Sequence, residues 1–136
     1  MLTGVLFVCV GNSCRSIMAE ALARHHFHDS LKAGSAGINP LGYIAEETLQ
    51  VLAELGVATE GLWSKGRSEI NFTEFQLIVN LTTYSLDSFL PQAFSGRSMR
   101  YPVADPFGGN LAGYRDSRDA IRQFITTTLA QYLTNL

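Results

Sequence analysis

The feature that most constrains this 136-residue chain is an apolar run that passes through a short loop into a helix-forming stretch. Residues 5–8 are apolar, β-branched or aromatic, which predicts a buried strand over 3–8, and the pattern after the loop predicts a helix over 15–28. The loop begins at Cys9 and ends at Arg15, with five residues between them. Successive backbone N–H groups of such a loop point into one concavity, which the helix dipole makes electropositive. We therefore expect an anion site here on backbone grounds alone.

The side chains of this loop add chemistry to the expected anion site. Cys9 lies among amide donors and near Arg15, so its nucleophilic thiolate form is expected to be favoured. The planar guanidinium of Arg15 matches two oxygens of a tetrahedral oxyanion. Gly11 is expected to allow a positive φ, Asn12 to tolerate a left-handed conformation, and Ser16 to offer its hydroxyl to the sulfur. The candidate phosphate-binding residues are Val10, Gly11, Asn12, Ser13, Cys14 and Ser16.

An isolated cysteine and arginine at this spacing are also compatible with a buried structural cysteine and a surface cation. Here the preceding strand, the Gly11-Asn12 pair and the following helix all agree with a phosphate-binding loop. We therefore interpret the loop as a phosphate cradle with an attacking sulfur at its base.

Composition excludes several classes of function. A net charge of −2 argues against a basic surface for nucleic acid or anionic membranes. No apolar run approaches the roughly 20 residues that span a bilayer, and the N-terminus lacks the charged region of a signal peptide. Both cysteines share one loop, which suits a working thiolate in the reducing cytoplasm better than a structural disulfide. The length and the 46% hydrophobic content predict a single domain over residues 1–136.

Strand and helix patterns alternate along the rest of the chain. Further strands are expected at 33–37, 76–81 and 98–101, a helix at 44–55, a short helix or irregular segment at 82–90, and a last helix from its N-cap Asn110 to about Leu133. Alternation of this kind predicts an α/β fold with a parallel sheet covered on both faces and a ligand at the carboxyl end of the first strand. The basic turn at 64–67 and the charged cluster of Arg115, Asp116, Arg118 and Asp119 are expected to face water.

Three histidines, His25, His26 and His28, lie near the end of the expected first helix. They have no carboxylate or cysteine partner evident nearby in the sequence, and histidines are favoured electrostatically at helix C-termini. We expect no metal site and no cofactor.

A second chemical feature is the turn formed by Asp105-Pro106-Phe107-Gly108-Gly109. Alone, an Asp-Pro pair predicts only a turn. A carboxylate on a Pro- and Gly-bounded loop is nevertheless well placed to reach over the anion pocket of a neighbouring strand. Together with the thiolate loop, Asp105 becomes a candidate general acid for a departing oxygen.

Residues 8–16 (VCVGNSCRS) and the Met18-Ala19-Glu20-Ala21 that follows resemble the low-molecular-weight protein tyrosine phosphatase superfamily, which includes arginine phosphatases and arsenate reductases of the same fold. The resemblance continues through residues 35–37, 52–57, 64–65 and 105–109. It implies a three-layer α/β/α fold with a four-stranded parallel sheet in the order 2-1-3-4. It also implies roles for Cys9 as nucleophile, Arg15 as oxyanion ligand and Asp105 as general acid and base. Tyr43 and Phe107 are implied as aromatic walls of the site.

The resemblance implies hydrolysis of a phosphorylated protein or a small aryl phosphate through a cysteinyl-phosphate. Tyrosine-specific relatives carry a bulkier apolar residue at the position of Ser13 and arginine phosphatases carry threonine, so both phosphotyrosine and phosphoarginine stay open. A silent oxyanion-binding module is disfavoured, because Cys9, Arg15 and Asp105 are all present.

Arsenate reduction is the alternative, because arsenate fits the same cradle. A reductase passes oxidising equivalents to further thiols, and thioredoxin-linked relatives carry two additional cysteines after the third strand. Residues 80–85 contain none, which leaves a reductase that uses an external thiol reductant. Ser13 and the Ser64-Lys65 pair are shared with the reductase branch. A Cys9–Cys14 disulfide is implied only as reversible protection of the nucleophile.

Overall fold

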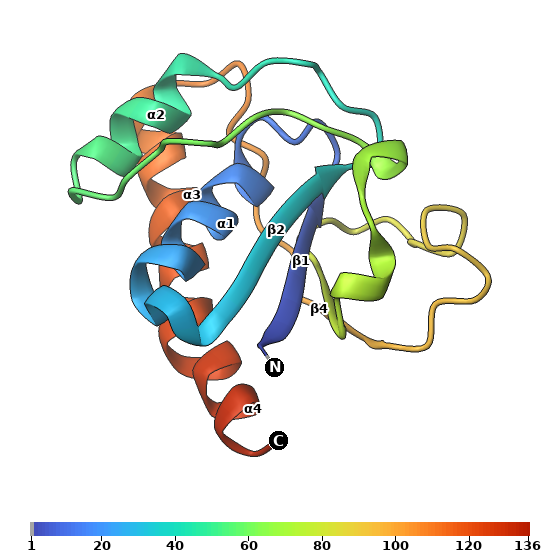
Figure 1. Cartoon of the computed structure of the whole chain (residues 1–136). Coiled ribbons are helices and arrows are strands. Elements are labelled where there is room, and N and C mark those ends of the chain that lie inside the picture. The colour runs from blue at the N-terminus through green and yellow to red at the C-terminus, as the bar shows by residue number, and fades with distance from the viewer. Residues whose placement is uncertain (1) are drawn as a thin grey trace.

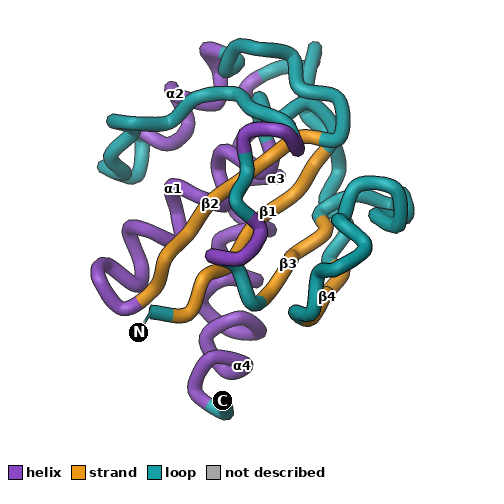
Figure 2. Tube along the Cα trace, turned by 45° about the vertical axis from the view of Figure 1, so that its right-hand side comes forward, coloured by secondary structure: helices purple, strands orange, loops and turns teal. Residues whose placement is uncertain are grey.

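A parallel sheet of four strands forms the centre of the structure, a computed structural model that describes residues 2–136. The strands are β1 (Thr3–Cys9), β2 (Leu31–Gly37), β3 (Leu77–Asn80) and β4 (Arg97–Arg100). They lie in the order β2-β1-β3-β4, which confirms the expected sheet (Figure 2). In the parallel register Cys9 pairs with Gly37 and Val8 pairs with Asn80. The carboxyl ends of β1, β2 and β3 therefore lie at the same edge of the sheet.

The α-helices pack together against one face of the sheet (Figure 1). They are α1 (Arg15–Phe27), α2 (Glu46–Ala53) and α3 (Leu111–Phe124), and α3 continues through a π-helical turn (Ile125–Leu129) into α4 (Ala130–Thr134). The side chain of Asn110 accepts a 3.1 Å hydrogen bond from the amide of Gly113, which confirms it as the N-cap of α3. Phe7, Met18 and Ile121 are fully buried in this core.

The other face of the sheet is covered by short 3-10 turns and irregular chain rather than by α-helices. Two of these turns are η2 (Arg67–Glu69) and η3 (Phe72–Glu74). Residues 82–90, for which a short helix or an irregular segment was expected, are irregular. Phe75 and Phe89 pack with Leu6 and Ile78 in a second buried cluster. This thinner layer still removes the second face of the sheet from water.

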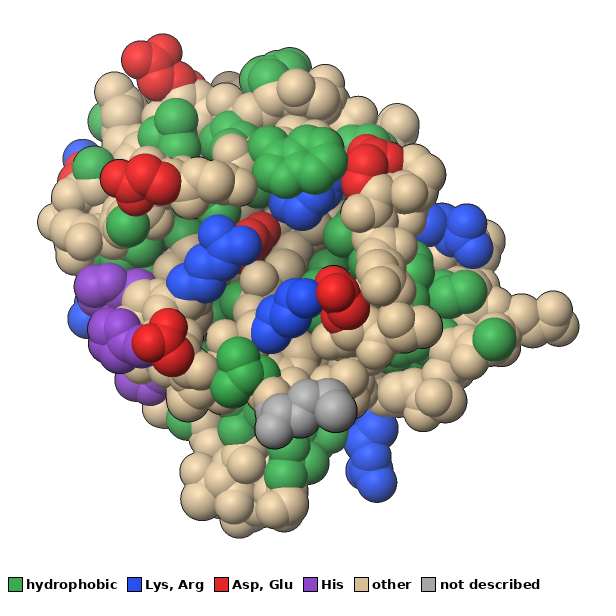
Figure 3. Space-filling model, in the orientation of Figure 1, with side chains coloured by type: hydrophobic (Ala, Val, Ile, Leu, Met, Phe, Trp, Pro, Cys, Tyr) green, Lys and Arg blue, Asp and Glu red, His purple; other side chains and the backbone are tan. Residues whose placement is uncertain are grey.

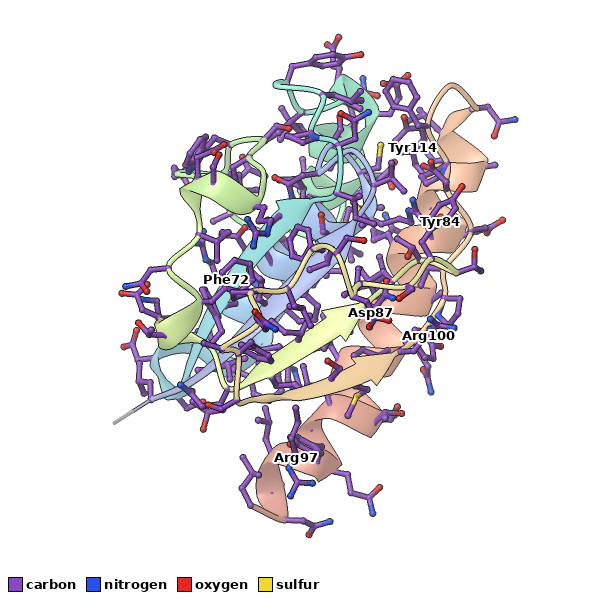
Figure 4. The ribbon with its side chains drawn as sticks, turned by 90° about the vertical axis from the view of Figure 1, so that its right-hand side faces the viewer. Phe72, Tyr84, Asp87, Arg97, Arg100 and Tyr114 are labelled. Atoms are coloured by element: carbon purple, nitrogen blue, oxygen red, sulfur yellow. The ribbon has the colours of Figure 1, made fainter. Side chains whose placement is uncertain are left out.

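The outer edge of the sheet is β4, whose side chains are mostly exposed. Arg97 and Arg100 lie on this edge strand (Figure 4). Charged side chains on an edge strand oppose pairing with another chain.

The expectation that the charged cluster of α3 faces water is wrong for Arg118. Its side chain is buried, and Nη1 donates to the carbonyl of Val51 (2.9 Å) and to the carboxylate of Glu54 (2.7 Å). The last carbonyls of a helix lack partners within the helix, so Arg118 satisfies one at the end of α2. Its position therefore joins α2 to α3.

The three histidines cluster on the surface at the end of α1, where Figure 3 shows them together. Across residues 2–136, no three or more His, Cys, Asp or Glu side chains gather in a way that could hold a metal ion. In the same part of the chain no helix has the length and apolar character required to cross a membrane.

Candidate active site

The loop between β1 and α1 is held by its carbonyl groups. Four of them accept hydrogen bonds from amides of the segment after β2: Cys9 from Ile38 (2.9 Å), Val10 from Asn39 (2.8 Å), Gly11 from Leu41 (2.9 Å) and Ser13 from Ala45 (3.3 Å). Within residues 2–136, the N–H groups of residues 11–14 have no hydrogen-bond acceptor. Because buried amides require partners, this arrangement leaves a group of donors for an anion.

The close packing of β2 on this loop depends on Gly37. A Cβ at that position would lie 2.7 Å from the carbonyl oxygen of Val10 and 2.9 Å from the amide of Asn12. The expected positive φ of Gly11 is wrong, because the left-handed residue of the loop is Asn12, with φ of 46°. Gly11 serves instead to admit Leu41, whose Cγ would lie 3.1 Å from an added Cβ.

The side chain of Asn12 holds its left-handed backbone in place and connects to Cys9 through Ser16. Asn12 Nδ2 donates to the hydroxyls of Ser16 (2.7 Å) and Ser35 (3.0 Å), and Asn12 Oδ1 accepts from the amide of Lys65 (2.8 Å). The Ser16 hydroxyl lies 2.9 Å from Cys9 Sγ. Since Ser16 Oγ already accepts from Asn12, its own proton is free to point at the sulfur.

A buried ion pair supports this network from behind. Lys65 Nζ lies 3.5 Å from Glu20 Oε1 and donates to the Ser35 hydroxyl (3.3 Å), while Ser35 donates to Glu20 Oε1 (2.5 Å). Burial lowers the pKa of Lys65 below its usual 10.5, and the Glu20 carboxylate opposes that change. Lys65 is therefore not part of a solvated basic turn, as the sequence suggested, but one end of a network that reaches Cys9 through Ser35, Asn12 and Ser16.

Arg15 is buried at the start of α1, and one N–H group of its guanidinium has no hydrogen-bond partner among residues 2–136. Its Nη1 donates to the carbonyls of Val103 (3.1 Å) and Leu81 (3.4 Å), which fixes the plane of the group. Its Nε is buried and has no partner among residues 2–136. A donor of this kind is costly unless a ligand satisfies it, so the free edge of Arg15 is suited to an oxyanion.

Asp105 lies beside Arg15 in the wall of a cavity. Its Oδ2 is 3.5 Å from Arg15 Nη2, and its Oδ1 accepts from the amide of Phe107 (3.1 Å). The cavity has a volume of about 200 Å³ and is lined by Cys9, Val10, Gly11, Ser13, Cys14, Arg15, Asn39, Leu41, Asp105 and Phe107. Tyr43 is exposed and lies outside this lining, and Leu41 takes the place that Tyr43 was expected to occupy.

Cys14, the second thiol of the loop, has a different environment from Cys9. Its Sγ lies 3.6 Å from the hydroxyl of Tyr114, a side chain that is only 1% exposed. Burial raises the pKa of Cys14 above its usual 9.0, and hydrogen bonding with Tyr114 and Thr48 opposes the rise. The thiol of Cys14 therefore stays protonated at neutral pH and donates to Tyr114.

Several of these residues were absent from the candidates chosen from the sequence. Glu20, Ser35 and Lys65 fell within the stretches that carried the family resemblance, yet nothing in their spacing connected them with each other. Leu41 and Tyr114 were not among the candidate site residues. The available signal was that two charged residues, Glu20 and Lys65, belong to the motifs that carry the family resemblance.

Comparison with known proteins adds evidence to this geometry. The model of the low molecular weight phosphotyrosine protein phosphatase family matches residues 4–136. The low molecular weight protein-tyrosine-phosphatase YfkJ of Bacillus subtilis (strain 168) is 34% identical over 97 residues, which cover 65% of this chain and 62%, less than two thirds, of that protein.

Two solved structures with different activities resemble the whole chain. The YwlE arginine phosphatase from Geobacillus stearothermophilus has a TM-score of 0.82 and 25% identity, and the match covers 98% of this chain and 94% of that one. Arsenate reductase from Archaeoglobus fulgidus has a TM-score of 0.81 and 30% identity, with coverage of 93% and 98%.

Proposed function

Since the chain belongs to the low molecular weight phosphotyrosine protein phosphatase family, we propose that it removes phosphate from phosphorylated protein side chains through a cysteinyl-phosphate. The observation that carries the proposal is the meeting of Asp105 and the partly unpartnered guanidinium of Arg15 at one cavity whose wall includes Cys9. Nucleophile, oxyanion ligand and proton donor are the three parts that the reaction requires.

In the first step the Cys9 thiolate attacks phosphorus. The S–P bond forms as the bond from phosphorus to the leaving group breaks, and Asp105 gives its proton to the leaving atom. Arg15 and the free loop amides bind the non-bridging oxygens, whose charge grows in the transition state. In the second step a water attacks phosphorus and gives a proton to the Asp105 carboxylate. The S–P bond breaks, phosphate leaves, and Cys9 is again a thiolate beside the Ser16 hydroxyl.

The proposed substrates are phosphotyrosine and phosphoarginine side chains, which relatives of both kinds support. Leu41 and Phe107 give the cavity two apolar walls suited to a flat substrate group. Ser13 is small and its hydroxyl accepts from the amide of Ala45 (2.8 Å), so it adds little bulk to the cavity floor. A cytoplasmic location belongs to the same proposal, because reducing conditions preserve the thiolate.

Arsenate reduction with an external thiol is the second candidate, and relatives named arsenate reductase support it. Arsenate would occupy the same cradle, and two external thiols would supply the two electrons that reduce it to arsenite, becoming a disulfide while one arsenate oxygen leaves as water. The only other thiol of the chain is Cys14, in the same loop.

The test measures turnover of p-nitrophenyl phosphate, phosphotyrosine peptide, phosphoarginine peptide and arsenate with small thiols or thioredoxin, for the parent protein and for Cys9→Ser. We expect hydrolysis of at least one phosphorylated peptide by the parent and none by Cys9→Ser, which should still bind inorganic phosphate. Ser30→Ala, at the opposite end of the sheet, is the control and should retain parental turnover. Efficient arsenate reduction with negligible phosphatase activity would replace the first candidate by the second.

A further inference from the structure

The segment that carries Asp105 has no regular secondary structure, so its position depends on contacts at its two ends. On the N-terminal side, the amide of Val103 donates to the carbonyl of Leu81 (3.0 Å), and the hydroxyl of Ser117 donates to the carbonyl of Ala104 (2.8 Å). On the C-terminal side, the amide of Gly109 donates to the carbonyl of Pro106 (2.9 Å), which closes the turn before α3.

Ser117 and Tyr114 are three residues apart on α3 and so lie on one helix face. Both are buried, and Figure 4 shows Tyr114 in the first part of α3, at the end of the molecule that carries the phosphate-binding loop. The Tyr114 hydroxyl accepts from the Cys14 thiol at 3.6 Å. One face of α3 therefore contacts the chain immediately before Asp105 through Ser117 and the phosphate-binding loop through Tyr114.

We propose that Ser117 and Tyr114 are positioning residues that hold Asp105 over the leaving-group atom. Ser117 fixes the peptide immediately before Asp105, and Tyr114 anchors the same face of α3 to the loop that binds phosphate. This inference rests on the proposed phosphatase activity. A carboxyl group on an irregular segment needs such support, because a misplacement of about 1 Å can cost about a hundredfold in rate.

The test uses Ser117→Ala and Tyr114→Phe with a series of aryl phosphates whose leaving groups differ in pKa. We expect kcat/KM to fall about tenfold for phenyl phosphate, whose departure needs a proton, and less than about twofold for p-nitrophenyl phosphate, whose departure needs little help. Inhibition by inorganic phosphate should be unchanged, because the phosphate-binding loop is intact. In an Asp105→Asn background neither substitution should cause a further loss, since both act through the same carboxyl group.

Tyr132→Phe and Ser30→Ala are matched controls. Tyr132 lies on α4, and the Ser30 hydroxyl donates to a backbone carbonyl, that of Phe27, at the other end of the molecule. Both controls should keep the parental dependence on the leaving group. Circular dichroism checks the folding of each variant. Ser117→Ala and Tyr114→Phe remove independent hydrogen bonds, so the inference can be tested with either variant alone if the other does not fold.

An equal loss across the aryl phosphate series, weaker phosphate inhibition, or a loss that persists in the Asp105→Asn background would overturn the inference. Undiminished turnover by Cys9→Ser would instead overturn the proposed function, so the two failures are distinct.

Discussion

Asp105 Oδ2 lies 3.5 Å from Arg15 Nη2, although the two residues leave the sheet from strands that are not neighbours. Arg15 follows β1 and Asp105 follows β4, with β3 between them. The side chain of Arg15 is 7% exposed and that of Asp105 is 52% exposed. The cation is therefore fixed, while the carboxyl group keeps contact with water and can approach a substrate.

Replacement of Asp105 by asparagine removes the proposed proton donor and leaves the size of the side chain almost unchanged. We expect kcat/KM for phenyl phosphate to fall by at least about a hundredfold, as is typical of a lost general acid, with a much smaller fall for p-nitrophenyl phosphate. Initial rates over the aryl phosphate series measure this difference. Asp29→Asn, on the surface after α1, is the control; similar losses for both phosphates would exclude an acid role for Asp105.

Ser16→Ala removes the hydroxyl that lies 2.9 Å from Cys9 Sγ. In the proposed second step the hydroxyl can donate to the sulfur as the S–P bond breaks, so its loss should lower kcat for p-nitrophenyl phosphate. The fall should be about tenfold or more, because a hydrogen bond to a charged group contributes about 1.5–3 kcal/mol and about 1.4 kcal/mol corresponds to a factor of ten. Initial rates at saturating p-nitrophenyl phosphate provide the measurement. An unchanged kcat would show that Ser16 does not act on the sulfur.

The ion pair between Glu20 and Lys65 should contribute to stability far more than an exposed pair does. Glu20→Ala removes the carboxylate that pairs with Lys65 and with the partly exposed Arg24. The Lys65 ammonium then stays buried without its carboxylate partner, and the free energy of unfolding should fall by about 3 kcal/mol or more. Glu74→Ala breaks the exposed pair with Lys32 and should cost less than about 1 kcal/mol. Urea denaturation compares the two variants, and equal losses would contradict the structural role of the buried pair.

Alkaline pH should destabilise the protein through Cys14. Burial raises the pKa of this thiol in the folded state, so above its usual value of 9.0 the unfolded chain loses the proton first and unfolding becomes more favourable. The free energy of unfolding should therefore fall less steeply from pH 8 to 10 in Cys14→Ala than in the parent. Lys65 acts in the opposite sense, but it is common to both proteins and cancels in the difference. Parallel slopes for the two proteins would refute this prediction.

Much of the fold was predictable because its signals are local. The apolar run before Cys9, the alternation of strand and helix patterns and the Asn110 cap each depend on residues close together in the chain, where propensity and periodicity act. The strand order required the family resemblance as well. The layer over the second face of the sheet was less predictable, because 3-10 turns and irregular chain carry no periodic pattern.

The sequence by itself determined that Cys9 and Arg15 belong to one site. Only five residues separate them, and so short a loop keeps the two close in any compact fold. Only the tertiary structure decided that Lys65 is buried against Glu20, that Leu41 rather than Tyr43 lines the cavity, and that α3 holds the Asp105 segment. These relationships depend on the parallel pairing of β1 with β2 and on the packing of α3 near the phosphate-binding loop. Both bring together residues that are far apart along the chain, and no local pattern records that proximity.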